Sequence, residues 1–402
     1  MNSKLNFTSE NLYKLLSVLR DNSSIPPRIV GGAVRDMLLD RKAVDIDIAT
    51  AIIPEEVLMI LHKNNIHAVP TGIKFGTVTA VFPGEHFEIT TLREDIECDG
   101  RWVNVSYTDD FEKDAQRRDF TINALSYEPY ENKLYDYFGG LSHLENKKVV
   151  FIGNAASRIL EDYLRILRFF RFSIRYANKL DEDGFATCCA YKEYLLKLSK
   201  ERITSEIDKI ISLPEAYKFL SKIVEGGIFE VLIPKHHINV HNLERANDIF
   251  KTYPERNISI EGFYALLLCQ QTKPVHKDIL QNFRFSNKSH KKILQFLNML
   301  SITNIDILIS QIKSICYEYP TITQELLTCC YINQQFSEEI FLDLSRQLSM
   351  PAPIFPITAK MLMDIGYEGR ELGAALNKLR ALWQQSDYKK TTEELLAICK
   401  EL

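Results

Sequence analysis

Residues 28–50, RIVGGAVRDMLLDRKAVDIDIAT, set the architecture of the first part of the chain. The apolar run at 28–30 predicts a short strand that ends at Gly31 and Gly32, and apolar side chains then recur at helical spacing. Residues 44–49 alternate apolar and acidic side chains, which is typical of a strand with one apolar face and one acidic face. A strand, a turn, a helix and a second strand in this order predict an α/β fold.

The two acids of that second strand are candidates for a metal site. Asp45 and Asp47 are two residues apart, so on a strand both carboxylates point to the same face. Two such carboxylates repel each other and favour a divalent cation, and hard oxygen ligands suit Mg²⁺. Glu88, on a predicted neighbouring strand, is a candidate third ligand. The alternative is that all three acids lie on a solvated strand surface.

The Gly31-Gly32 turn is a candidate phosphate site. Paired glycines between a strand and a helix let the backbone approach a ligand closely, and the helix that follows offers free N–H groups to an anion. Arg35 adds a forked donor suited to phosphate. A phosphate site close to a pair of metal-binding acids is what nucleotidyl transfer requires, whereas a glycine pair alone is usually just a turn.

The composition sets limits on the class of protein. The chain has 402 residues, 46% of them hydrophobic and 25% charged, values typical of a globular protein with about two to three domains. No run of about 18 apolar residues predicts a membrane span, and the polar start predicts a cytoplasmic protein without a signal peptide. The eight cysteines form no CxxC motif and are expected to be free thiols. Because the net charge is −4, a nucleic acid must bind through a local basic face.

The pattern changes along the chain. Helices are expected over 9–20 and 54–64, and strands over 76–82 and 86–91. From about residue 155 the spacing is helical, with segments near 155–177, 188–197, 203–211, 214–225 and 241–251. The sequence therefore predicts an α/β head with a mixed β-sheet, then a mostly α-helical neck, body and tail, with ranges 1–150, 151–210, 211–300 and 301–402.

Five motifs in order resemble one family. They are GGAVRD (31–36) with DID (45–47), RRDFTINAL (117–125), YDYFGGLSHLENKKV (135–149), GNAASRILEDYLRILRFFRF (153–172) and, more weakly, SKERITSEI (199–207). These segments resemble the nucleotidyltransferase core of class II CCA-adding tRNA nucleotidyltransferases and bacterial poly(A) polymerases. The resemblance covers about the first 210 residues and implies an enzyme that uses CTP and ATP as substrates and tRNA as partner.

The RRDFTINAL motif carries a second set of candidates. Arg117 and Arg118 are adjacent and cannot share a face of regular structure, so one can bind phosphate while the other makes a structural pair. By resemblance, Arg118 is a triphosphate ligand and Asp119 binds the ribose. Asn123, four residues after Asp119, is expected to line the same pocket. The polar stretch 93–110 resembles the family's flexible loop, and its full length favours complete CCA synthesis.

The segment 161–171 is expected to lie within one helix. Asp162, Arg165, Arg168 and Arg171 are three residues apart and form a slanted row of neighbours. On a generic helix this row would be a solvated face with an Asp–Arg pair and a Glu161–Arg165 pair. Beside a phosphate site, the family resemblance implies that Arg168 and Arg171 bind the triphosphate and that Glu161 holds Arg165. Tyr163 stands where a proline is frequent in the family.

The chemistry of Asp162 and Arg165 predicts base selection. A carboxylate only accepts hydrogen bonds and a guanidinium only donates them. Cytosine and adenine both offer an amino donor beside a ring-nitrogen acceptor, whereas guanine and uracil offer the reverse. A buried unpaired contact costs about 1–3 kcal/mol, so two mismatches give roughly 10²-fold discrimination or more. Such a pair selects C and A without a nucleic-acid template.

The C-terminal half offers less explicit chemistry. His236, His237 and His241 are expected to be surface residues, and the absence of any His-Asp dipeptide predicts no metal-dependent phosphohydrolase domain. The basic segment FRFSNKSHKK (283–292) is a candidate RNA contact. The tail resembles that of the family and carries four cations, Lys360, Arg370, Lys378 and Arg380. They are expected either to contact tRNA phosphates or to form an ordinary solvated helix face.

The predicted function is addition or repair of the 3′-terminal CCA of tRNA, with Asp45 and Asp47 holding the catalytic metals. The alternatives are a poly(A) polymerase on the same core and an enzyme that adds only CC or only A. A non-catalytic RNA-binding protein is the remaining class, and the intact pair of aspartates argues against it.

Overall fold

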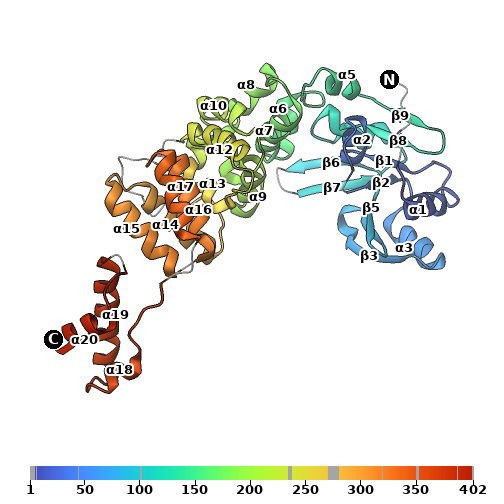
Figure 1. Ribbon diagram of the computed structural model, residues 1–402. Coiled ribbons are helices and arrows are strands. Elements are labelled where there is room, and N and C mark those ends of the chain that lie inside the picture. Colours follow the sequence, from blue (N-terminus) through green and yellow to red (C-terminus); the bar gives the residue numbers. More distant parts are fainter. Residues whose placement is uncertain are drawn as a thin grey trace. The chain divides into compact units, whose positions relative to one another are not determined.

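A computed structural model of the chain divides it into two compact units, Met1–Pro234 with Asn282–Arg284, and Lys235–Gln281 with Phe285–Leu402 (Figure 1). The structure describes residues 5, 7–43, 45–99, 102–233, 238–269, 280–318, 320–349, 353–386 and 388–400. Within these ranges, the side chains of 95–105, 316–321 and 399–400 are not described.

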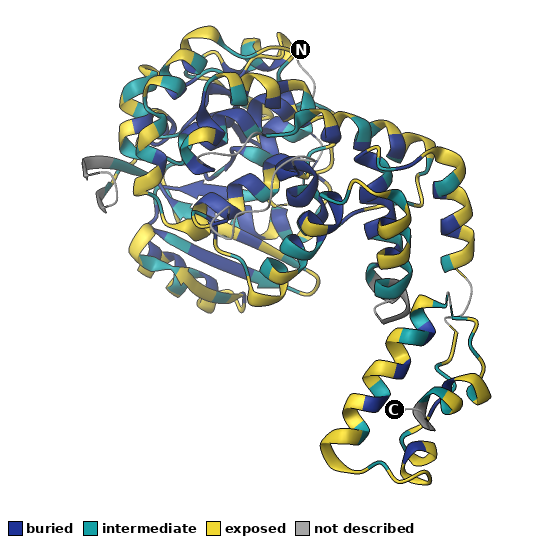
Figure 2. Cartoon of the chain, turned by 90° about the vertical axis from the view of Figure 1, so that its left-hand side faces the viewer, coloured by how far each residue is buried: buried dark blue, intermediate teal, exposed yellow. Residues whose placement is uncertain are grey.

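The first unit is built on a mixed seven-stranded sheet, which confirms the predicted fold class. The strand order is β3-β4-β5-β2-β1-β8-β9, in which β2 and β5 are parallel and the other neighbours are antiparallel. The strands are β1 (Arg28–Val30), β2 (Asp47–Thr50), β3 (His67–Gly72), β4 (Thr77–Phe82), β5 (Glu85–Thr91), β8 (Ser126–Glu128) and β9 (Lys133–Tyr135). Figure 2 shows these strands largely buried beneath helices with exposed outer faces.

Most predicted strands are confirmed, with three differences. The strand expected over 44–49 begins only at Asp47, so Asp45 lies just before it. β3 was not predicted because most of its residues are exposed at the edge of the sheet, and β8 and β9 have only three residues each. The stretch 93–110, expected as a loop, contains the antiparallel strands β6 (Arg93–Asp99) and β7 (Trp102–Tyr107).

Five helices complete the head. They are α1 (Glu10–Arg20), α2 (Gly32–Leu38), α3 (Pro54–Lys63), α4 (Phe111–Gln116) and α5 (Gly140–Glu145), with two 3-10 turns, η1 (Ile73–Phe75) and η2 (Thr121–Asn123). α1 begins after Ser9, whose hydroxyl caps Leu12 N, and its four leucines are fully buried. α3 begins with Pro54 at its first turn, as predicted, and packs on β3 and β4.

The helix expected over 155–177 is broken, and that prediction is wrong at its centre. α6 (Ala155–Glu161) ends at Asp162, which is extended, and α7 (Arg165–Tyr176) begins three residues later. The Asp162 carboxylate accepts a hydrogen bond from Leu164 N, and its carbonyl accepts one from Arg165 N. An aspartate that binds the following backbone in this way competes with helix continuation. Residues Asp162–Leu164 therefore form a turn that separates α6 from α7.

α7 is anchored to the head by aromatic rings. Phe169 lies 5.3 Å from Phe151 and 6.3 Å from Phe120, measured between ring centroids. All three rings are buried. The remaining helices of this unit are α8 (Glu182–Ala190), η3 (Lys192–Lys197), α9 (Lys200–Ile211), α10 (Tyr217–Glu225) and α11 (Ile228–Leu232).

Every regular element in the described part of the second unit is a helix. Its helices are α12 (Val240–Thr252), α13 (Ile260–Leu268), α14 (Asn287–Leu300), α15 (Ile305–Glu318), α16 (Pro320–Ile332), α17 (Glu338–Leu348), α18 (Ala359–Met363), α19 (Gly369–Gln385) and α20 (Thr392–Lys400). The last three share a small core around Leu362, Leu379 and Trp383. No helix in the described ranges is long and apolar enough to cross a bilayer.

Candidate active site

A cavity of about 700 Å³ lies in the first unit and is lined from both the head and the α6–α7 turn. The predicted site residues that line it are Gly31, Gly32, Arg35, Asp45, Asp47, Arg118, Asp119, Asn123, Asp162, Arg165 and Arg168. Glu88, Glu161 and Arg171 are not among the lining residues. Four arginines or acids that were not assigned to the site also line it, and they are Asp36, Arg117, Arg175 and Arg202.

The acidic side of the cavity contains Asp45 and Asp47. Asp47 is the first residue of β2 and is directly opposite Glu88 of β5 in the parallel register, so both side chains share one face of the sheet. Burial raises the pKa of the Asp47 carboxyl to about 6, and the negative charges of Glu88 and Asp45 add to this shift against the opposing Arg118. A bound cation would relieve this repulsion. Among the described residues no group of three His, Cys, Asp or Glu side chains is arranged to hold a metal, so Glu88 as third ligand stays a prediction.

The phosphate side begins at Gly31, where only glycine fits. Its φ of +69° is in the left-handed region, and a Cβ there would lie 2.9 Å from Nη1 of Arg118. Arg35, on α2, is buried and donates to the side chains of Asn123 and Asp36. Its guanidinium also lies 4.3 Å from the ring centroid of Tyr176 on α7. Arg35 is therefore held in place before any ligand binds.

Asp114 organises both arginines of the RRDFTINAL motif, and sequence reasoning missed it. Arg117 Nη2 lies 2.7 Å from one Asp114 oxygen and Arg118 Nη2 lies 3.1 Å from the other. Burial raises the pKa of Asp114, but the guanidiniums of Arg118 and Arg117 outweigh it and hold the pKa below its usual value. Arg117 is the C-cap of α4 and Arg118 follows it, so the two arginines do not lie on regular structure, and both line the cavity.

Asp119 is a structural centre of the site. One carboxylate oxygen accepts hydrogen bonds from Phe120 N and Asn123 Nδ2, at 2.8 and 2.9 Å. The other accepts from Nε and Nη2 of Arg168, at 2.7 and 2.6 Å. Burial raises the pKa of Asp119, but Arg168 and these hydrogen bonds together hold it below its usual value. A carboxylate has about four acceptor positions, so this one has none left for a ribose hydroxyl.

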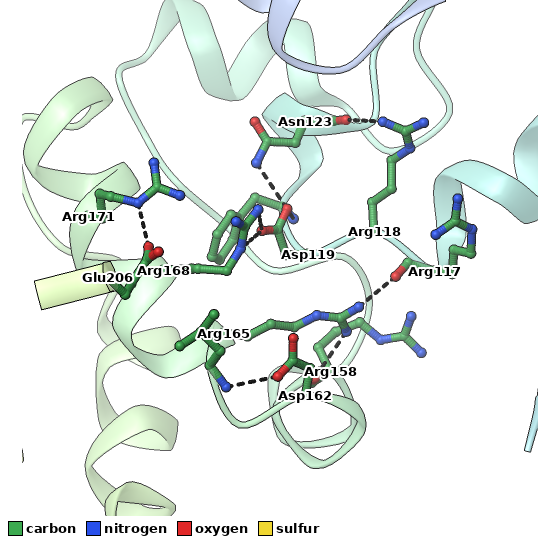
Figure 3. Close-up of polar contacts among 12 residues, drawn as sticks. Arg117, Arg118, Asp119, Asn123, Arg158, Asp162, Arg165, Arg168, Arg171 and Glu206 are labelled. Atoms are coloured by element: carbon green, nitrogen blue, oxygen red, sulfur yellow. Dashed lines mark hydrogen bonds and ion pairs between the residues drawn. The ribbon is translucent and has the colours of Figure 1, made fainter. Parts of the chain in front are cut away.

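Arg165 is fixed by neighbours on both sides of the α6–α7 turn (Figure 3). Its Nη1 lies 2.6 Å from Glu161 Oε2 and 3.0 Å from Arg158 O, and its Nη2 lies 2.7 Å from Arg117 O. The contact between Glu161 and Arg165 is the one that the resemblance implied. These bonds use three of the five guanidinium hydrogens, which leaves Nε–H and one Nη2–H free for a ligand.

Asp162 has a partner that the sequence did not reveal. Nη2 of Arg202, on α9, lies 3.0 and 2.8 Å from its two carboxylate oxygens. Arg202 belongs to the SKERITSEI motif, which resembled the family only weakly, and its 40-residue distance from Asp162 hid the pairing. The turn thus presents a carboxylate already held by a cation, beside a guanidinium with free donors.

The three arginines of α7 that follow Arg165 divide into two groups. Arg168 and Arg175 are seven residues apart, so they lie on the same side of the helix, and both line the cavity. Arg171 instead pairs with the buried Glu206 of α9 and is not a lining residue. Arg171 was predicted because it is three residues after Arg168, but at that position it points toward α9. Arg175, seven residues after Arg168, is the arginine that lines the cavity beside it.

The basic segment 283–292 is partly engaged in the protein itself. Phe283 is buried, and Lys292 Nζ lies 2.7 Å from Glu325 Oε2 within the second unit. His241, expected at the surface, is exposed and lies 3.5 Å from Glu244, whereas His236 and His237 lie outside the described residues. The described cysteines are free thiols, as expected.

Paired carboxylates, a glycine turn and an arginine-lined cavity at one end of a mixed sheet define a nucleotidyltransferase. Residues 27–150 match the model of the Poly A polymerase head domain, and residues 179–238 match that of the probable RNA and SrmB-binding site of polymerase A. The chain is 32% identical over 389 residues to the mitochondrial CCA tRNA nucleotidyltransferase 1 of Mus musculus, covering 93% of this chain and 86% of that protein. It belongs to the family of CCA-adding tRNA nucleotidyltransferases.

Two further proteins are similar to this chain over nearly its whole length, one in sequence and one in structure. The CCA-adding enzyme of Bacillus cytotoxicus is 31% identical over 372 residues, covering 91% of this chain and 89% of that protein. The crystal structure of the Bacillus stearothermophilus CCA-adding enzyme in complex with CTP superposes with a TM-score of 0.74 and 25% identity, covering 97% of this chain and 96% of that one.

Proposed function

We propose that this protein adds or repairs the 3′-terminal CCA of tRNA, using CTP and ATP, releasing pyrophosphate and requiring no nucleic-acid template. One observation carries the proposal. The carboxylate pair Asp45 and Asp47 and the proposed base-selecting pair Asp162 and Arg165 line the same cavity of about 700 Å³. Membership of the CCA-adding family over almost the full length supports it.

Asp45 and Asp47 would hold the divalent cations, which we propose to be Mg²⁺. Their oxygen ligands are hard, and the raised pKa of Asp47 reflects the unscreened negative charge of this corner. When bound, divalent ions activate the attacking 3′ hydroxyl of the tRNA and offset charge on the leaving pyrophosphate. Glu88 adds negative charge from the neighbouring strand.

The arginines bind the triphosphate. Arg35, Arg118 and Arg168 come from three different elements and line the cavity with their guanidiniums already paired to Asp36, Asp114 and Asp119. Such paired side chains keep their geometry when the ligand arrives and so lose little conformational entropy on binding. They place the α-phosphorus of CTP or ATP for attack and stabilise the charge that develops on its oxygens.

Base selection follows from the donors and acceptors that remain. Arg165 has two free N–H groups, one of which donates to the ring nitrogen of cytosine or adenine. The exocyclic amino group donates to Asp162, where it joins or replaces Arg202. Uracil and guanine would place a carbonyl against Asp162 and an N–H against Arg165. At about 1–3 kcal/mol for each mismatch, the preference for C and A is roughly 10²-fold or more.

Contact with tRNA by the C-terminal part stays a prediction. The four cations proposed for it are all exposed on α18 and α19, and they are Lys360, Arg370, Lys378 and Arg380. A cytoplasmic location also stays a prediction from the polar N-terminal sequence, and the Mus musculus relative is named as mitochondrial. Subcellular fractionation distinguishes the two compartments.

The test uses the whole protein, Mg²⁺ and a tRNA transcript that ends at the discriminator base. With CTP alone the product should grow by two nucleotides, and with CTP and ATP it should stop at three. Changing Asp45 and Asp47 to alanine should abolish turnover and largely spare tRNA binding in a filter assay. Turnover by that variant would refute the metal assignment, and a long ladder with ATP alone would identify a poly(A) polymerase instead.

A further inference from the structure

Arg158 lies outside the cavity but contacts both Arg165 and Glu161, which holds Arg165. It is on α6, with 18% of its side chain exposed. Its Nη1 donates to the carbonyl of Gln116 at 2.7 Å, and its Nη2 forms an ion pair with Oε1 of Glu161. Its own backbone carbonyl accepts a hydrogen bond from Arg165 Nη1 at 3.0 Å.

These contacts make Glu161 a bridge between two guanidiniums. One of its carboxylate oxygens binds Arg158 and the other binds Arg165 at 2.6 Å. A carboxylate with a guanidinium on each oxygen has little freedom to rotate, whereas with one partner it can follow that partner as it moves. Arg158 therefore limits where Arg165 can go.

The same residues fasten the α6–α7 turn to the end of α4. The carbonyls of Gln116 and Arg117 are among the last acceptors of that helix, which have no partner within it. Arg158 bonds to the first of them and Arg165 to the second, both at 2.7 Å. The helix end that these bonds hold also carries the cavity-lining side chains of Arg117 and Arg118. The turn that selects the base and the residues that bind phosphate thus form one braced unit.

We propose that Arg158 is a positioning residue for base selection, which it achieves by holding Glu161 and, through it, the guanidinium of Arg165. The inference rests on the proposed function and extends it to a residue that does not touch the substrate. Without Arg158 the Arg165 guanidinium gains freedom to turn, and its remaining donors can then avoid the N–H of a wrong base. Selectivity between CTP and UTP should fall more than the rate with CTP.

The alternative is that Arg158 only stabilises the fold. Loss of a purely structural contact would lower the activity with CTP and with UTP by the same factor and would lower the unfolding temperature. A change in the ratio of the two activities is a readout that such a role does not move. The ratio of kcat/KM for CTP to that for UTP is therefore the quantity to measure.

The experiment compares the whole wild-type protein with Arg158→Met and Arg158→Lys on a tRNA that ends at the discriminator base. Arg20→Met is the matched control, because Arg20 is an ion-paired arginine on α1 outside the cavity. In Arg158→Met the CTP-to-UTP ratio should fall about 10-fold while kcat with CTP stays within about 3-fold. Arg158→Lys keeps the charge but can reach one acceptor at a time, so its ratio should be intermediate.

An unchanged ratio in both variants, or equal losses with CTP and UTP, would overturn the proposal. The lysine variant keeps the test decisive if the methionine variant fails to fold. A wild-type protein that prefers CTP no more than UTP would contradict the proposed function and would leave Arg158 nothing to position. If the wild-type protein prefers CTP to UTP and the Arg158 variants keep the same CTP-to-UTP ratio, the proposed function stands and only the role of Arg158 is contradicted.

Discussion

Replacing Asp119 with asparagine separates two roles for this residue. The sequence resemblance assigned it to the ribose, whereas the structure uses its carboxylate to hold Arg168, Asn123 and the backbone of Phe120. The introduced amide would keep one acceptor oxygen and would turn an NH₂ group toward the guanidinium of Arg168. The change therefore breaks the ion pair with little loss of volume.

The expected loss of stability follows from the burial of the two partners. The side chain of Asp119 is 7% exposed and that of Arg168 is 32% exposed. Breaking a fully buried pair costs about 3–5 kcal/mol, but solvent reaches Arg168, so about 2–3 kcal/mol is the appropriate figure here. Arg168 would also lose its fixed position at the triphosphate. A charge-assisted contact is worth about 1.5–3 kcal/mol, so kcat/KM should fall about 10- to 100-fold with CTP and ATP alike.

The assay is the free energy of unfolding in urea together with kcat/KM for CTP, ATP and dCTP. The structural role predicts that the ratio of CTP to dCTP activity changes by less than about 3-fold, because no contact to the ribose is lost. Asp21→Asn, at an exposed residue of the same unit, is the control and should leave both quantities unchanged. An Asp119→Asn variant of normal stability whose preference for CTP over dCTP has collapsed would refute this reasoning and restore the ribose assignment.

Three other changes test the remaining parts of the site. Asp162→Asn offers a donor as well as an acceptor, so UTP should be incorporated at least about 10-fold better relative to CTP in single-turnover assays, and an unchanged ratio would contradict the base-selecting role. Asp114 and Asp119 have lower pKa values in the folded protein than in the unfolded chain, so their ionised carboxylates stabilise the fold above the unfolded pKa of about 4. This stability is lost as the pH falls through their pKa values in the folded protein. Urea unfolding from pH 7 to pH 3 should show it, with a shallower fall in Asp114→Asn. The pKa of Asp47, raised to about 6, means that protons compete with the cation, so Mg²⁺ should bind more weakly below pH 6 in titration calorimetry, and pH-independent binding would argue against Asp47 as a ligand.

The head could be predicted because its residues carry local signals. The alternation in β4 and β5 and the proline at the start of α3 gave those elements nearly to the residue. β3 and β6 escaped because an exposed edge strand and a charged strand lack a period-two apolar pattern. The alternation from Val103 to Tyr107 in β7 was overlooked, because the whole stretch 93–110 was assigned as a loop. The helix break at Asp162 escaped because it depends on two hydrogen bonds of the turn and not on any glycine or proline.

The site could be predicted where a motif supplied both the residue and its neighbours. Gly31, Arg35 and Asp47 lie where their motifs indicated. Arg202 could not be predicted, because its partner Asp162 is 40 residues away and Arg202 looks like an ordinary helix-surface charge in the sequence. Asp114 was overlooked, although it precedes Arg117 and Arg118 by three and four residues, a spacing that favours ion pairs. The contacts of Asp119 were not predicted for the same reason as the pairing of Arg202, since its main partner, Arg168, is 49 residues away.

The central claim is that the protein alone selects C and A and stops after three nucleotides. The most direct measurement supplies the wild-type protein and Mg²⁺ with all four nucleoside triphosphates at equal concentration and a tRNA ending at the discriminator base, and then sequences the 3′ ends of the products. The account predicts that CCA ends dominate and that U and G are rare at every added position. Mixed ends, or long adenosine tails, would contradict it.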